Sequence, residues 1–299
     1  MKLSIIIVSF NTRDVLSHCL ESLYTGYKQQ FINKQFEVIL IDNASSDDTI
    51  VMIKKAFPWV TLIQSESNSG FAKANNWGIQ KSHGEYVLLL NPDTIVEKNT
   101  LTYLITYMDG HQAVGISTCK VLLTNGQLDD ACHRGFPTPW RAFTYFSGLA
   151  KLFPHSTFFN GYHLGYQHMD EIHEIESCVG AFLLIRRTIG ERVHWLDEDY
   201  FWYGEDLDLC YRVKQLGSKI MYIPDVSIIH YKGAASGLKK HSQHITKADS
   251  GVKLRATEAR FAVMRTFYEK HYRTLYPRWM MRLVFLGIGI KEKVARTQL

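Results

Sequence analysis

A single carboxylate, Asp93, follows an unbroken apolar run and marks the first place where this sequence could do chemistry. Residues 87–90 are apolar at consecutive positions, which is typical of a strand buried on both faces of a parallel sheet. Pro92 fixes the turn after this strand and removes a backbone donor. Because ligands of open α/β sheets bind beyond the carboxyl ends of the strands, we predict a ligand site at Asp93. A turn or capping aspartate would look the same, so the rest of the sequence must decide.

Other acidic side chains lie at comparable positions. Asp42 follows a second apolar run, residues 36–41, and so also comes at the carboxyl end of a predicted strand. Residues 197–208 contain six carboxylates interleaved with aromatic residues, which we interpret as a pocket rather than a solvated face. Glu205 and Asp206 fall in the first turn of a predicted helix, beside its positive dipole end. Helix capping alone would need only one or two of these acids.

Histidines and cysteines form no recognised metal or redox pattern. Residues 125–176 are rich in histidine, yet no His-Glu-x-x-His or similar spacing occurs, so packing or surface roles are predicted. The five cysteines are widely spaced without a Cys-x-x-Cys pair, which suits a reducing cytoplasm. The first ten residues imitate a signal peptide but lack a cleavage site, so we interpret them as a strand and expect a cytoplasmic protein.

The elements that must position these residues alternate along the first half of the chain. Strands are predicted at 3–10, 36–41, 60–64 and 86–90, and helices at 11–24, at 50–57 and after Gly70. This alternation predicts an α/β fold with a parallel sheet, right-handed crossovers and a nucleotide-binding half. Neither Gly-x-Gly-x-x-Gly after the first strand nor a Gly-x-x-x-x-Gly-Lys loop occurs, which excludes the two common phosphate loops.

The second half is less regular. Residues 94–124 predict a helix and a strand, whereas 125–176 lack clean periodicity, and such long connections are more often functional than inert. Residues 177–187 predict a buried strand, and 219–229 a strand region that delivers His230.

The C-terminal segment carries the positive charge. The net charge is +5, and residues 251–299 hold eleven Lys and Arg against three Glu, or +8, which leaves −3 for the remainder. No nucleic-acid-binding pattern accompanies this charge, so an anionic membrane surface explains it better than nucleic acid. Residues 252–275 predict an amphipathic helix. The apolar stretch 279–290 is shorter than the roughly 20 residues needed to span a membrane, so it is interfacial, packed on the catalytic domain or an oligomer contact.

Seven short motifs stand in the order and spacing of a known enzyme family. They are Ser9-Phe10-Asn11, Asp42-Asn43, Asn68-Ser69-Gly70, Asn91-Pro92-Asp93, Gly180-Ala181, Gly204-Glu205-Asp206, and His230 with Gly233. The chain resembles inverting glycosyltransferases of family two, and within them the bacterial rhamnosyltransferase-like branch. The resemblance covers residues 3 to about 235. It implies a GT-A fold: α/β, Rossmann-like, with a mostly parallel central sheet, helices on both faces and a C-terminal helical extension.

The resemblance also implies roles for individual residues. Asp206 would be the general base, Asp93 and His230 would hold Mg²⁺ or Mn²⁺, and Gly180, Trp202 and Glu205 would lie on the acceptor side. The donor would be bound by Ser9, Asn11, Asp42, Asn43, Gly70, Lys73, Asn76, Asn91 and Asp93.

Two positions depart from the family pattern. Asn91 stands where many relatives carry the first Asp of Asp-x-Asp, and an amide is a weaker ligand for a hard cation. Asn75 stands where relatives outside this branch often carry Arg, and Lys73 is expected to make the donor-phosphate contact instead.

We therefore expect a catalytic domain at 1–240 and a basic amphipathic helical extension at 241–299. Residues 1–124 would bind the nucleotide sugar, and 125–240 would supply the acceptor and catalytic half. The expected reaction moves a sugar, with rhamnose from dTDP-rhamnose as the best candidate, from a dTDP- or UDP-sugar to a surface glycan or lipid-linked saccharide. A sugar nucleotidyltransferase is the alternative enzyme, although its glycine-rich loop is absent, and an inactive glycan-binding scaffold is the alternative without catalysis. A peripheral membrane contact and a homo-oligomer are compatible with the sequence.

Overall fold

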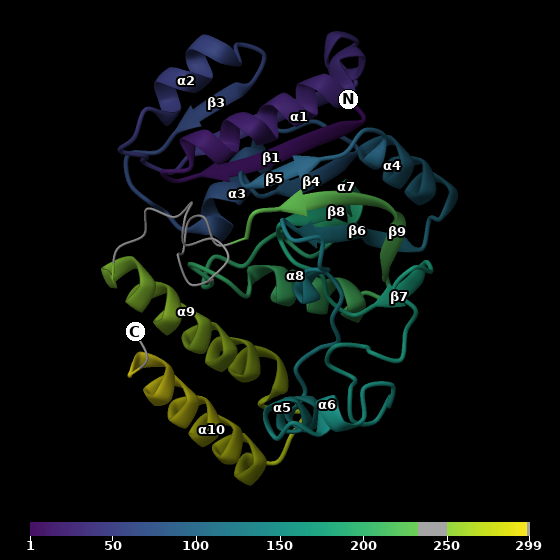
Figure 1. Ribbon diagram of the computed structural model, residues 1–299, viewed down its shortest axis with the longest axis vertical. Coiled ribbons are helices and arrows are strands. Elements are labelled where there is room, and N and C mark those ends of the chain that lie inside the picture. Colours follow the sequence, from purple (N-terminus) through teal and green to yellow (C-terminus); the bar gives the residue numbers. More distant parts are fainter. Residues whose placement is uncertain (233–249, 298–299) are drawn as a thin grey trace.

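The computed structural model describes residues 1–232 and 250–297 (Figure 1). The first part of the chain forms β1 (Leu3–Ser9), α1 (Arg13–Ile32), β2 (Phe36–Asp42), α2 (Thr49–Ala56), β3 (Thr61–Gln64), α3 (Phe71–Gln80) and β4 (Tyr86–Leu90). It continues through β5 (Thr94–Val96), α4 (Thr100–Gly110), β6 (Val114–Leu123), the 3₁₀ turn η1 (Asp130–Cys132), α5 (Pro139–Phe146), α6 (Leu149–Leu152), β7 (His173–Ile175), β8 (Phe182–Arg186), α7 (Arg187–Arg192), α8 (Glu205–Gln215) and β9 (Lys219–His230).

Within the described residues, one sheet runs in the order β3-β2-β1-β4-β8-β6-β9-β5, with β7 beside β9. The first four of these strands are parallel, as the sequence predicts, and Ser9 lies opposite Asp42 in the register of β1 and β2. Right-handed crossovers place α1, which leads to β2, and α3, which leads back to β4, on opposite faces of the sheet. The expected α/β fold with helices on both faces is confirmed.

The strand that follows β4 in the sheet runs the other way. β8 is antiparallel to both β4 and β6, so the sheet as a whole is mixed rather than parallel throughout. Leu90, the last residue of β4, pairs with Phe182, the first residue of β8. The residues just before β8 therefore lie beside the carboxyl end of β4. β9 is parallel to β6, which brings its last residue, His230, to the same edge of the sheet.

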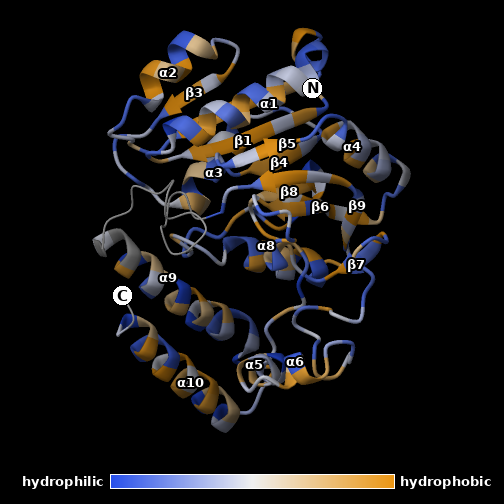
Figure 2. Cartoon of the chain, viewed as in Figure 1, coloured by the Kyte–Doolittle hydropathy of each residue, from blue (hydrophilic) through white to orange (hydrophobic). Residues whose placement is uncertain are grey.

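The central strands form the core. Every residue of β1 and β4 is buried, and Figure 2 shows the strands among the most hydrophobic elements of the chain. Burial of each large aliphatic side chain stabilises the fold by about 1.5–3 kcal/mol. Gly78 lets α3 approach the sheet closely, because a Cβ atom there would lie 2.6 Å from Ile41 and 2.7 Å from Ile6. This packing fixes α3, and with it the loop before it, against the ends of β1 and β2.

The C-terminal extension packs on the sheet-containing part of the protein through aromatic residues. It consists of α9 (Ser250–Phe267), the π-helical turn η3 (Tyr268–Tyr272) and α10 (Arg278–Arg296). Phe267, Tyr268, Tyr272 and Met281 are buried together with Leu207 of α8. The boundary expected near residue 240 lies outside the described residues. No helix in the described part of the chain is long and apolar enough to span a membrane.

Several elements differ from their predictions. The first helix extends to Ile32 across a kink at Tyr27, whose backbone is not helical and whose side chain is buried. The expected helix over 252–275 ends at Phe267, and Leu275 is exposed rather than on an inner face. Residues 125–176, which lack periodicity, contain η1, α5, α6 and β7. These elements are only three to eight residues long, too short for a periodic pattern to be visible.

Candidate functional site

The ends of β1 and β2 form the first part of the site. Asp42 is fully buried, and its Oδ2 accepts the amide of Ser45 at 3.0 Å. Its Oδ1 has no hydrogen-bond partner among the described residues, and an unpaired buried carboxylate oxygen requires an explanation. Beside it, Ser9 contacts the hydroxyl of Thr12 at 2.9 Å, and Asn11 accepts the amide of Ser46 at 2.8 Å. The free oxygen of Asp42 is therefore the acceptor that this corner can offer to a ligand N–H group.

Asn43 organises the glycine turn that precedes α3. Its side-chain nitrogen donates to Asn68 at 2.9 Å, and its oxygen accepts the amide of Ser69 at 2.9 Å. Gly70 has φ +84°, and a Cβ atom there would lie 2.7 Å from the carbonyl oxygen of Phe201. Gly70 thus allows the turn to contact the loop before α8 directly, and Asn43 acts by holding that turn.

The two expected donor residues on α3 behave differently. Lys73 is exposed, with its ammonium 5.7 Å from the ring centroid of Trp77. Asn76 uses both ends of its amide on the loop before α8, since it donates to Leu196 at 2.9 Å and to Glu198 at 3.0 Å and accepts the amide of Leu196. The structure therefore places Asn76 as a clamp between two segments of the site, whereas Lys73 is free to reach a ligand.

A buried acid–imidazole pair lies at the same edge. Asp93 Oδ1 is 3.3 Å from His230 Nε2, because Thr94 of β5 pairs directly with His230 of β9. The other ring nitrogen of His230 contacts Asp129 at 3.2 Å, and Asp129 also holds the ammonium of Lys232. Burial opposes protonation of His230, but Asp93 and Asp129 outweigh it and raise the pKa of His230 to about 9.

Asp93 offers its carboxylate to a cation directly, and His230 offers Nε2 when a cation takes the place of the proton that faces Asp93. The described residues contain no cluster of three or more metal-binding side chains. Two protein groups suit Mg²⁺ or Mn²⁺ held mainly by substrate phosphates and water. The contact between His230 and Asp129 is also the arrangement that orients a metal-binding histidine. The backbone of Asn91 holds the turn that carries Asp93. Its N–H donates to the carbonyl of Ala181 at 3.1 Å, and its carbonyl accepts the hydroxyl of Thr94 at 2.8 Å. The donor set fits a divalent cation on a diphosphate.

Two adjacent acids begin α8 after Gly204, whose φ is +85°. Asp206 accepts the amide of Gly180 at 2.9 Å and that of Leu207 at 2.7 Å, and Arg134 lies 3.6 Å away. These contacts orient the carboxylate but leave its second lone pairs available, and the side chain is 13% exposed. Asp206 can therefore accept a proton from a ligand that enters beside Gly180.

Glu205 lies in a different environment. It is 6% exposed, and its Oε2 has no partner among the described residues. Burial, followed by the charge of Asp206, raises the pKa of Glu205 to about 8. Near neutral pH the carboxyl group of Glu205 is therefore protonated. Trp202, the other expected acceptor-side residue, stacks on Tyr203 with ring centroids 5.3 Å apart.

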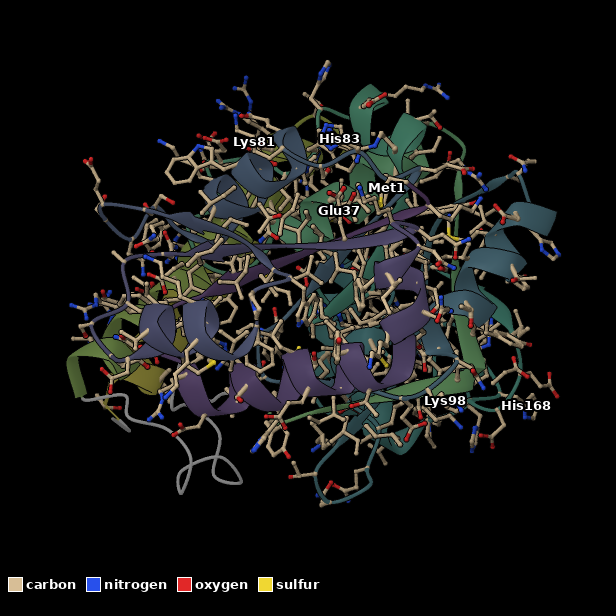
Figure 3. The ribbon with its side chains drawn as sticks, turned by 90° about the horizontal axis from the view of Figure 1, so that it is seen from above. Met1, Glu37, Lys81, His83, Lys98 and His168 are labelled. Carbon is tan, nitrogen blue, oxygen red and sulfur yellow. The ribbon has the colours of Figure 1, made fainter. Side chains whose placement is uncertain are left out.

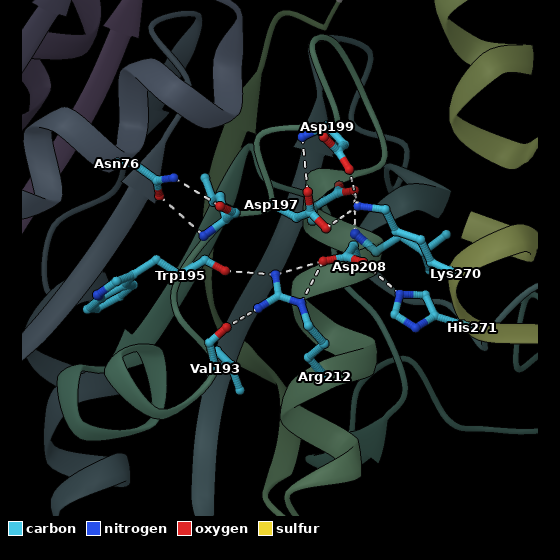
Figure 4. Close-up of polar contacts among 12 residues, drawn as sticks. Asn76, Val193, Trp195, Asp197, Asp199, Asp208, Arg212, Lys270 and His271 are labelled. Carbon is cyan, nitrogen blue, oxygen red and sulfur yellow. Dashed lines mark hydrogen bonds and ion pairs between the residues drawn. The ribbon is translucent and has the colours of Figure 1, made fainter. Parts of the chain in front are cut away.

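Four of the six acids in residues 197–208 bind other parts of the protein, which corrects the interpretation of the whole segment as a pocket. One of the four is Glu198, which accepts the amide of Asn76. Asp208 is fully buried between Arg212 at 2.7 Å and His271 at 2.6 Å (Figure 4). Asp197 and Asp199 both bind Lys270 of η3. Asp208, Asp197 and Asp199 therefore attach the C-terminal extension to the catalytic part.

The opposite edge of the sheet has a structural role. Glu37 accepts the hydroxyl of Ser4 at 2.6 Å and the amide of His83 at 2.9 Å, which ties the amino-terminal ends of the strands together (Figure 3). Two residues near the site were missed by sequence reasoning, namely Asp129 and Arg134. Both come from the irregular segment after β6, where neither spacing nor periodicity distinguishes them from surface charges.

Comparisons with known proteins agree with this geometry. A family model described as Glycosyl transferase family 2 matches residues 4–170. The rhamnosyltransferase WbbL of Escherichia coli K12 is 26% identical over 238 residues, covering 76% of this chain and 82% of WbbL. The N-acetylglucosaminyl-diphospho-decaprenol L-rhamnosyltransferase of Mycobacterium tuberculosis is 25% identical over 215 residues, covering 67% of this chain and 68% of that protein.

A solved structure shows the same fold. GalNAc-T7 with UDP, GalNAc and Mn²⁺ superposes with a TM-score of 0.57 at 16% identity, covering 91% of this chain and 54% of that one. The likeness confirms the GT-A architecture.

Proposed function

Because the chain belongs to glycosyl transferase family 2, we propose that it transfers a sugar from a nucleotide diphosphate to an acceptor hydroxyl, with inversion at the anomeric carbon. One observation carries the proposal. Three groups lie at the edge of the sheet formed by the carboxyl ends of its parallel strands: the unpaired oxygen of Asp42, the Asp93–His230 pair and the carboxylate of Asp206. They match the three needs of the reaction, namely recognition of a base, neutralisation of a diphosphate and removal of a proton.

Each group has a defined task in this reaction. Asp42 accepts the imide N–H of a uracil or thymine base. Asp93 and His230 would hold Mg²⁺ or Mn²⁺, which neutralises negative charge on the departing diphosphate. Asp206 removes the proton of the acceptor hydroxyl as that oxygen attacks the anomeric carbon from the face opposite the diphosphate. Arg134 and the amide of Gly180 keep the Asp206 carboxylate in one orientation.

The donor and acceptor are proposed from the relatives. Two of them are named rhamnosyltransferases, and one name specifies a decaprenol-linked acceptor. We therefore assign dTDP-rhamnose as the donor and a lipid-linked or surface glycan as the acceptor. A lipid-linked acceptor would bring the basic extension to the cytoplasmic face of a membrane, where anionic lipids attract it.

A donor screen tests this function. Purified protein is incubated with Mn²⁺ and dTDP-rhamnose, UDP-N-acetylglucosamine or GDP-mannose, and thermal shift and nucleotide diphosphate release are measured. We expect dTDP-rhamnose to give the largest stabilisation, because bound ligand stabilises in proportion to occupancy. Asp206→Asn should stop release but keep the shift, whereas the exposed control Asp225→Asn should change neither. The proposal would be contradicted if none of the nucleotide sugars shifted the melting temperature, or if Asp206→Asn released nucleotide diphosphate at the wild-type rate.

A further inference from the structure

Exposed apolar side chains are concentrated on two segments of this protein. Twelve of the twenty-two large exposed hydrophobic residues in the described chain lie between residues 140 and 158 or on α10. The first segment exposes Trp140, Phe143, Tyr145, Phe146, Leu152, Phe153 and Phe158, and α10 exposes Trp279, Leu283, Leu286, Ile290 and Val294. Single exposed apolar residues are ordinary, but a concentration of this kind indicates a binding surface.

The exposed residues of α10 form one stripe. Their spacing of four, three, four and four residues places them on a single side of the helix. The other side faces the protein, where Met281 is buried and Val284 and Phe285 pack against the same cluster. α10 therefore carries apolar side chains on its outer side as well as on its inner side.

The charges of α10 are arranged around that outer stripe. Arg282 and Lys293 are exposed, come directly beside stripe residues and form no ion pair among the described residues. The single acid of the helix, Glu292, lies on the inner side and is bound by Arg265 and Arg296. The outer face thus combines apolar side chains with unpaired positive charge and carries no negative charge.

The two segments are neighbours. The ammonium of Lys291 lies 4.9 Å from the ring centroid of Phe146, so the end of α5 meets α10 (Figure 1). Within the first segment, Trp140 contacts Phe143 and Phe158, with ring centroids 5.6 and 4.8 Å apart. The contact between Phe146 and Lys291 joins the two segments, which we call together the aromatic–basic face: residues 140–158 and the outer stripe of α10.

We infer that the aromatic–basic face lies in the headgroup layer of an anionic membrane, with α10 and residues 140–158 inserted side by side. Tryptophan and tyrosine favour this layer because their rings are apolar and their polar atoms stay hydrated. Unpaired cations beside an apolar stripe match anionic lipids. A second copy of the chain fits less well, because a two-fold contact would place Arg282 and Lys293 of both copies together with no acid between them.

The inference rests on the proposed function only for its purpose, which is access to a lipid-linked acceptor. The link to the site is short, since Arg134, which contacts Asp206, lies five positions before the first residue of α5. The hydroxyl of Tyr268 also donates to the carbonyl of Pro137 at 2.6 Å, directly before α5. Docking of this face would therefore hold the acceptor pocket at a fixed distance from the bilayer.

Vesicle co-sedimentation of the full-length protein tests the inference, with no donor present. Wild type should bind phosphatidylglycerol vesicles, bind phosphatidylcholine vesicles weakly and dissociate at high salt. Phe143→Ser with Leu152→Ser, and separately Leu283→Ser with Leu286→Ser, should each lower binding at least tenfold. Arg282→Gln with Lys293→Gln should lower it about 25-fold, from roughly fivefold per cation. The matched control, Val51→Ser with Ile32→Ser, removes equally exposed apolar residues elsewhere and should bind like wild type.

Three outcomes would overturn the inference. One is loss of vesicle binding in the α10 variants together with normal binding by Phe143→Ser with Leu152→Ser, which would exclude residues 140–158 from the membrane contact. A second is equal binding to both lipids, which would exclude the cations. A third is a stable wild-type dimer without vesicle binding, which would assign the face to self-association. Transfer to a detergent-soluble acceptor, measured in parallel, should be unchanged in every variant, so a failure of the proposed reaction is seen separately.

Discussion

Replacing Glu205 with glutamine should change how the stability of the folded protein depends on pH. Glu205 is buried with an unpaired oxygen, and burial raises its pKa from 4.5 to about 8. The unfolded chain holds this proton only below about 4.5, whereas the folded protein keeps it to about 8, so stability falls as pH rises between those values. At about 1.36 kcal/mol per pH unit, the full loss is at most about 5 kcal/mol.

At pH 4 Glu205 is neutral in the folded protein and mostly neutral in the unfolded chain, and Glu205→Gln replaces it by another neutral group of the same shape. We expect the unfolding free energies of the two proteins to agree within about 1 kcal/mol at pH 4. At pH 9 the wild type must bury a charge and the variant does not, so the variant should be the more stable by a few kcal/mol. Urea denaturation at both pH values measures the difference, with the exposed Glu66→Gln as control. Identical pH slopes for wild type and Glu205→Gln would show that Glu205 is ionised and solvated, and would refute the reasoning.

Three further changes should separate the roles of the site. Asp206→Asn should lower the transfer rate by about 10²–10⁴ and leave donor affinity nearly unchanged in calorimetry; near-normal turnover would move the base to Glu205. Asp93→Ala and His230→Ala should each weaken Mn²⁺-dependent binding of a nucleotide diphosphate, and Asp129→Asn should weaken it about 10–100-fold by releasing the second ring nitrogen of His230; unchanged calorimetric affinity would remove the residue concerned from the cation site. His271→Ala should destabilise the protein by about 3 kcal/mol and speed proteolysis of the extension, because it leaves a buried carboxylate on α8 short of a donor; a wild-type cleavage rate would contradict this.

Strands β1, β2 and β4 could be predicted because each is buried on both faces, which leaves a continuous apolar run in the sequence. Strand direction leaves no such trace. A strand was predicted at 177–187, and β8 occupies only Phe182–Arg186 of that range; the pairing of Leu90 with Phe182 shows that it is antiparallel to β4. The short elements of 125–176 could not be predicted from periodicity. Many of their aromatic residues are exposed and belong to the aromatic–basic face, so they do not repeat with the period of a core-facing helix or strand.

The site was predicted where its residues follow strand ends and missed where they come from loops. Asp42 and Asp93 stand directly after apolar runs, so parallel strands bring them to one edge. Asp129 and Arg134 reach the same place only because the chain after β6 folds back over β9, a tertiary event that no local pattern encodes. Asn76 was assigned to the donor, but the structure uses its amide on Leu196 and Glu198.

The loop before α8 connects the donor side of the site with the extension. On one side Glu198 and Leu196 are held by Asn76 of α3, and on the other Asp197 and Asp199 are held by Lys270 of η3. The same loop leads directly into Glu205 and Asp206 at the start of α8. A force on the extension, such as the docking of α10 on a bilayer that we propose, would therefore reach Asp206, the proposed general base, through two or three contacts. The acids at 197 and 199 need not touch a sugar to affect transfer, because they set where the loop that carries the pocket aromatics can lie.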